Sequence, residues 1–167
     1  MTQLYKEEWR YFREKYLKIF IFVLITYTLF ALLSHIALVN NPVESQKKFV
    51  ELAKIISEKI PINATGFELC LAIFINNLKV SLFSILLGLI TFVFFPIVGA
   101  MANGFNTGII TSAIYIEGLK LGSFLLFAIA PHGVFELPSV LYSVSIGIFL
   151  SFQISKRILH GREISDE

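Results

Sequence analysis

A histidine and a glutamate lie in one of the most apolar stretches of this chain. His132 and Glu136 are the only histidine or formally charged side chains between Leu121 and Ile154, and Pro131 and Gly133 flank the histidine. A spacing of four residues puts both side chains on one face of a helix. Because a charge at the bilayer centre costs roughly 2.5–3.5 kcal/mol, such residues face a cavity or a partner. This segment is the first candidate site.

Two kinds of chemistry fit His132 and Glu136. A histidine nitrogen and a glutamate oxygen suit a divalent metal such as zinc, although a zinc site needs one or two further ligands. Candidates for these ligands are Glu68, Glu117, His35 and an asparagine carbonyl. The second possibility is a proton or ion relay in which Lys79 and Glu136 form a buried pair. The sequence has no HExxH motif, nucleophile set or phosphate-binding glycine loop, so an enzyme is not expected.

Asparagines provide the other polar groups in apolar segments. Asn76 shares a helix face with Lys79, and Asn103 shares one with Asn106. Asparagine hydrogen bonds between membrane helices contribute about 0.6–2 kcal/mol each, so a purely structural role is the alternative to function. The small pair Gly104-x-x-x-Gly108 permits close helix packing. We expect a core polar cluster with these members: Asn76, Asn77, Lys79, Asn103, Asn106, His132 and Glu136.

Composition indicates an integral membrane protein. The 167 residues are 56% hydrophobic and 16% charged, against about 25% charged in soluble domains. The mean hydropathy is +0.75. A net charge of +2 without a long basic tract argues against nucleic acid as a partner. Cys70 is the only cysteine, which excludes an intrachain disulfide and a cysteine-cluster metal site.

We expect one all-α membrane domain over 1–167, a helical bundle of four or five transmembrane segments. The expected full spans are 17–39, 69–95, 97–116 and 136–155. A half-helix is expected over 121–131, broken or re-entrant at Pro131–Gly133. Irregular backbone at membrane depth is tolerated only where protein or a cavity satisfies it.

The segments outside the spans carry most of the charge. Aromatic and basic residues alternate over 1–16, which suits a cytoplasmic or interfacial helix. Asn41, Pro42 and Glu44 predict the start of an amphipathic extracytoplasmic helix over 41–60, either a structural lid or a partner-binding element. Basic residues before the first span and in the 156–167 tail indicate cytoplasmic termini in the plasma membrane.

The chain resembles the stage II sporulation protein M family of multi-pass membrane proteins. The resemblance covers roughly 67–155 and rests on these motifs: Phe74-Ile75-Asn76-Asn77-Leu78, Asn103-Gly104 followed by Gly108, and Pro131-His132-Gly133 with Glu136. It implies a polytopic helical protein that is not a recognised enzyme. In endospore formers the family member belongs to an engulfment complex, where it localises or scaffolds cell-wall-degrading partners.

The expected function is therefore a scaffold or assembly factor for a membrane or envelope complex. Its expected partners are the lipid bilayer and either a second copy, as a dimer, or other envelope proteins. Whether the polar cluster binds a divalent metal such as zinc is left open. The alternative is a small ion or metal transporter that uses Lys79, Asn76, Asn103, His132 and Glu136. An intramembrane hydrolase that uses His132 and Glu136 is a third, weaker possibility.

Overall fold

The structure is a computed structural model that describes residues 2–58, 66–90, 94–126 and 130–160. All regular secondary structure within these ranges is helical, which confirms the all-α prediction. The elements in chain order are α1 (Thr2–Tyr11), the π-helical η1 (Phe12–Tyr16), α2 (Leu17–Val39), α3 (Pro42–Ser57), α4 (Gly66–Leu89), α5 (Phe94–Ile116), α6 (Leu121–Phe124) and α7 (Ala130–His160).

Three helical stretches in the described ranges are long and apolar enough to cross a membrane. They are Trp9–Val39, Pro96–Ile116 and Glu136–Ile158. A shorter apolar stretch, Phe74–Leu89, forms most of α4. The helices confirm the predicted all-α membrane fold.

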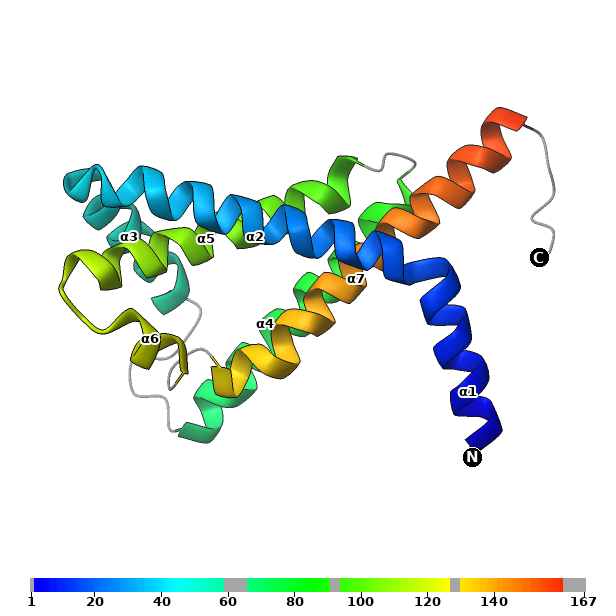
Figure 1. Cartoon of the computed structure of the whole chain (residues 1–167), viewed down its shortest axis with the longest axis horizontal. Helices are drawn as coiled ribbons and strands as arrows, with labels where there is room; N and C mark the ends of the chain where they lie inside the picture. The colour runs from blue at the N-terminus through cyan, green and yellow to red at the C-terminus, as the bar shows by residue number, and fades with distance from the viewer. Residues whose placement is uncertain (1, 59–65, 91–93, 127–129, 161–167) are drawn as a thin grey trace.

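The long helices form two pairs. Figure 1 shows α2 beside α5 in one arm of the molecule and α4 beside α7 in the other. The arms converge where α2 passes α7, and they diverge toward the end that carries α3 and α6. Residues of different arms therefore meet mainly at the crossing.

Small residues bring α2 and α5 together. Ala100, Gly104, Gly108 and Ser112 repeat every four residues on α5, and all are buried. A Cβ atom added at Gly104 would meet the backbone oxygen of Tyr27 on α2. Gly108 approaches α2 just as closely one turn later. The Gly104–Gly108 pair is thus a helix-packing motif.

The α4–α7 pair is equally tight at one point. A Cβ atom added at Gly88 would meet the backbone of Gly147, and one added at Gly147 would meet the backbone oxygen of Ser84. One turn before Gly147, the hydroxyl of buried Ser143 donates to the carbonyl of Ser139 at 2.9 Å. Further along α7, the buried hydroxyl of Ser151 has no hydrogen-bond partner among the described residues.

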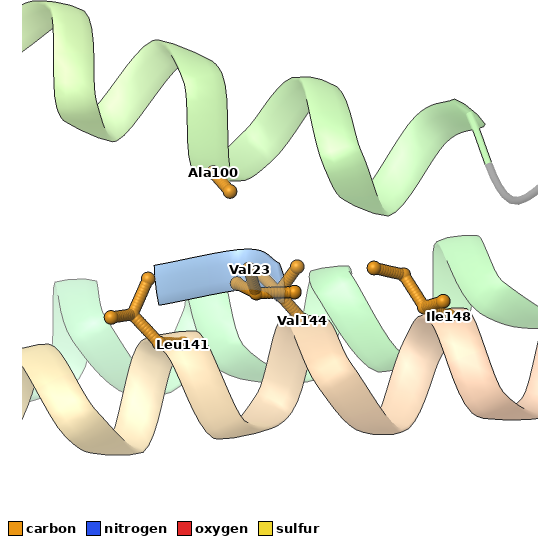
Figure 2. Packing of buried hydrophobic residues seen from close by; sticks show 5 residues of the cluster. All are labelled: Val23, Ala100, Leu141, Val144 and Ile148. Atoms are coloured by element: carbon orange, nitrogen blue, oxygen red, sulfur yellow. The ribbon is translucent and has the colours of Figure 1, made fainter. Parts of the chain in front are cut away.

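The apolar core lies where the arms cross. Val23 of α2, Ala100 of α5 and three residues of α7 form it, and each is at most 1% exposed; the α7 members are Leu141, Val144 and Ile148. In Figure 2, Ala100 points from α5 toward Val23 and Val144. This cluster joins the two helix pairs.

Helix α3 begins as its sequence predicts. The side chain of Asn41 accepts a hydrogen bond from the backbone N–H of Glu44 at 3.4 Å, and Pro42 is the first helical residue. The hydroxyls of Ser45 and Ser112 lie 2.9 Å apart, and both side chains are fully buried. This contact docks α3 on α5. The last two residues of the expected 41–60 helix lie outside the described ranges.

The boundaries around Pro131 differ from the prediction. Helix α6 begins at Leu121, where the half-helix over 121–131 is expected to begin, and Leu125 and Leu126 continue it as π-helix. Residues 127–129 lie outside the described ranges, and α7 begins at Ala130 instead of 136. A proline in the first turn leaves no hydrogen bond unmade, because the first N–H groups of a helix have no intrahelical acceptor. Pro131 therefore lies in the first turn of a helix of 31 residues.

Candidate functional site

The polar site of the α4–α7 pair is a hydrogen bond between Asn77 and Glu136. The amide nitrogen of Asn77 donates to a carboxylate oxygen of Glu136, with 2.6 Å between Nδ2 and Oε2. Both residues are half-buried. The bond joins a carboxamide donor on α4 to a carboxyl acceptor on α7. Two of the polar sets found in the sequence therefore meet at this point.

The backbone of His132 lies in the first turn of α7, one turn before Glu136. Its side chain lies outside the described part of the structure. Among the described side chains, no group of three or more histidine, cysteine, aspartate or glutamate residues is placed to hold a metal ion. The predicted zinc site at His132 and Glu136 therefore stays a hypothesis.

Lys79 and Asn76 do not join Glu136. Both side chains are exposed on α4, and no ion pair of Lys79 is formed among the described residues. The reason is helix geometry, because Lys79 follows Asn77 by two residues, or about 200° around the helix axis. Asn77 faces α7, so Lys79 faces away from it. The predicted buried Lys79–Glu136 pair is thus wrong in this structure.

Asn103 and Asn106 belong to the other helix pair. The amide of Asn103 donates to the carbonyl of Gly99 on its own helix at 2.9 Å, and Asn106 is exposed. Because the small-residue face of α5 packs on α2, neither asparagine is hydrogen-bonded to Glu136 in the described structure. The described side chains among the seven residues do not form one cluster, and the side chain of His132 lies outside the described part of the structure. The contact between Asn77 and Glu136 is the part of the predicted cluster that the structure contains.

A second polar interface, not predicted from the sequence, joins α2 to α5. The hydroxyls of Tyr27 and Thr107 lie 2.8 Å apart. One turn further along α5, the Thr111 hydroxyl lies 3.0 Å from Nδ1 of His35 on α2. Thr107 and Thr111 are one turn apart beside Gly108, and this spacing is the signal that could have indicated the interface. These bonds join helices and bring no catalytic set together.

The fold and these contacts define an all-α membrane protein in which hydrogen bonds and close glycine contacts hold helix pairs together. Residues 18–166 match the family described as Stage II sporulation protein M, and the chain belongs to this family. The resemblance inferred from the Asn-Asn, Asn-Gly and Pro-His-Gly motifs is thereby confirmed.

Two relatives from Methanocaldococcus jannaschii are described as uncharacterized proteins. MJ0793 is 36% identical over 94 residues, which cover 55% of this chain and 51% of the relative. MJ0706 is 27% identical over 143 residues, which cover 80% of this chain and 59% of the relative. The chain thus spans little more than half the length of each relative. No solved structure matches it.

Proposed function

We propose that this protein is a membrane scaffold that binds a partner membrane helix through the outward face of α4. We define this face by Ile75, Lys79, Leu82 and Leu86, which point away from α7 by helical spacing. The three apolar residues are 41%, 52% and 55% exposed in chain order. Lys79 is the single charged residue among them, and its exposure is the observation that carries the proposal.

The position of Lys79 along α4 makes this exposure costly in a bilayer. Helix α4 has 24 residues and is therefore about 36 Å long, enough to cross a hydrocarbon core of about 30 Å. Lys79 lies near its middle. A cation at the bilayer centre costs roughly 2.5–3.5 kcal/mol on insertion scales, and charged membrane residues pair with one another. A partner helix with a carboxylate at the same depth would remove this cost.

The partner is a different membrane protein rather than a second copy. Glu136 is the only carboxylate in the interior of the apolar helices, and it already accepts a hydrogen bond from Asn77. Because Glu136 is half-buried against the side of α4 that faces α7, it is not presented to Lys79 on the outward face of a second copy. The family supports the same role, because the resemblance implies a scaffold within an envelope complex.

The charge distribution supports an orientation in the plasma membrane with both termini cytoplasmic. Figure 1 places α1 and the end of α7 at the same end of the molecule, opposite α3. Exposed basic residues gather there, among them Arg10, Arg13, Lys156 and Arg157. Basic residues flanking membrane spans favour the cytoplasmic side. In this orientation α3 is extracytoplasmic.

A binding assay with synthetic membrane helices tests the proposal. The full chain, labelled with a donor fluorophore, is reconstituted with a leucine-rich transmembrane peptide that carries an acceptor and one central aspartate. We expect this peptide to bind roughly tenfold more tightly than its all-leucine version, equivalent to about 1.4 kcal/mol. Lys79→Met should abolish the preference, whereas Lys54→Met on α3 should not. Equal binding of both peptides to the wild-type chain would contradict the proposal.

Transport remains the second candidate function, because the half-buried pair of Asn77 and Glu136 offers a polar site between α4 and α7. If the protein conducts ions, proteoliposomes that contain it should show an ion flux that Glu136→Gln abolishes. A flux of H⁺, Na⁺, Mg²⁺ and Zn²⁺ no higher than that of empty liposomes would exclude this function for the reconstituted chain.

Elemental analysis of protein purified without added metal decides whether zinc is bound. Energy transfer between two labelled copies would reveal a homodimer instead of a foreign partner.

A further inference from the structure

The N-terminal helix leaves the direction of α2 at a π-helical turn. Helix α1, the turn η1 (Phe12–Tyr16) and α2 follow one another without a break. Figure 1 shows α1 directed away from the axis of α2, at the end of the molecule where the arms cross. Single π-helical turns occur frequently at functional sites.

Aromatic contacts fix the bend against α7. The ring of Phe12 lies 5.6 Å from that of Tyr142, measured between centroids. The ring of Tyr16 lies 4.7 Å from that of Phe149. Phe12 also contacts Phe20 on α2, with centroids 6.3 Å apart. Aromatic pairs at these separations contribute about 0.5–1.5 kcal/mol beyond the burial of their area. The direction of α1 is thus set by side-chain packing.

The surface of α1 and η1 that α7 does not cover combines an exposed aromatic side chain with a row of basic side chains. Trp9 is 64% exposed, although its ring contacts Phe12 with centroids 5.5 Å apart. Lys6, Arg10 and Arg13 are also exposed, and their spacing of four and three residues places them along one side of α1 and η1. A tryptophan beside basic residues is typical of helices at the membrane–water interface.

Of the two amphipathic segments, only the N-terminal one has an excess of positive charge. Residues 2–18 contain five basic and three acidic side chains, whereas residues 42–58, which hold α3, contain three of each. Both segments are amphipathic helices at the end of an apolar span. An electrostatic attraction to an anionic surface is therefore expected for α1 and not for α3.

We infer that α1 and η1 bind the headgroups of anionic phospholipids in the bilayer that α2 crosses. The aromatic contacts hold α1 off the axis of the span, at the level of the headgroups. There Arg10 and Arg13 can bind lipid phosphates through their planar guanidinium groups, and Lys6 adds a third cation. Trp9 sits among the headgroups beside them. The inference is independent of the role proposed for α4.

Trp9 is the only tryptophan of the chain, so its fluorescence reports on α1 in the unmodified protein. The full chain is reconstituted in phosphatidylcholine vesicles with a fixed fraction of phosphatidylglycerol. In one sample the phosphatidylglycerol carries the bromine quencher, and in a second sample the phosphatidylcholine carries it. We expect brominated phosphatidylglycerol to quench Trp9 at least about twofold more strongly at equal bromine content, because basic residues enrich anionic lipid around them. High salt should reduce the difference.

Paired variants separate headgroup binding from general membrane contact. Arg10→Gln with Arg13→Gln should equalise the two quenching strengths, while Lys47→Gln with Lys54→Gln on α3 should preserve the difference. Circular dichroism confirms that each variant keeps its helix content. Equal quenching in the wild-type chain would overturn the inference. A preference that survives in the arginine variant would overturn it as well.

Discussion

The contact of Gly147 with α4 makes the most quantitative prediction. A Cβ atom added at this glycine would meet the backbone oxygen of Ser84 and would lie 3.3 Å from Cγ of Pro96. Backbone and proline atoms cannot rotate aside as the end of a flexible side chain can. Gly147→Ala must therefore push α4 and α7 apart or bend one of them.

The change in the free energy of unfolding caused by Gly147→Ala is the sum of two opposing effects. Overpacking of a tight interface costs about 1–3 kcal/mol. Replacement of glycine by alanine in a helix returns up to about 1 kcal/mol through backbone entropy. Gly122 on α6 serves as the control, because a Cβ atom added there meets nothing within 4 Å. Subtracting the effect of Gly122→Ala removes most of the entropic part and leaves a difference of about 1–3 kcal/mol.

Unfolding of each variant by dodecyl sulfate in mixed micelles, followed by circular dichroism, measures this difference. Gly147→Ala should unfold at a lower sulfate fraction than the wild-type chain, and Gly122→Ala at an equal or higher one. If both variants unfold together, or if Gly147→Ala is the more stable, α4 and α7 do not pack at Gly147 and the pairing described above is wrong.

Three further outcomes can be measured by the same unfolding assay. Asn77→Leu and Glu136→Leu should be non-additive by roughly 0.6–2 kcal/mol in a double-mutant cycle, and additivity would mean that the two side chains do not interact. Ser151→Ala should leave stability unchanged or raise it by up to about 1 kcal/mol, since the hydroxyl lacks a partner among the described residues; a clear loss would reveal one. Asn41→Ala should cost about 0.5–2 kcal/mol, and no loss would refute the cap.

Local signals in the sequence are sufficient to predict where an individual helix begins. Asn41, Pro42 and Glu44 define the start of α3 because a cap, a proline and an acidic first turn act within one turn of the helix. Pro131 is ambiguous in sequence, since a proline is compatible both with a break in a helix and with the first turn of one. The flanking residues do not decide between these cases.

Helix pairing could not be predicted, because it depends on contacts between distant segments. Gly88 and Gly104 look alike in sequence, yet one packs on Gly147 and the other on Tyr27. The same limit applies to Asn76 and Asn77. They are adjacent, and only the orientation of α4 against α7 determines that Asn77 meets Glu136. Once that orientation is known, the outward position of Lys79 follows from helix geometry.

Charge reversal at Lys79 tests the proposed scaffold role most directly. In the peptide-binding assay, Lys79→Glu should lose its preference for the aspartate-bearing helix and acquire one for a helix with a central lysine, because opposite charges pair in the bilayer. Lys54→Glu on α3 should retain the wild-type preference. A Lys79→Glu chain that still prefers the aspartate peptide would contradict the claim that α4 binds its partner through this lysine.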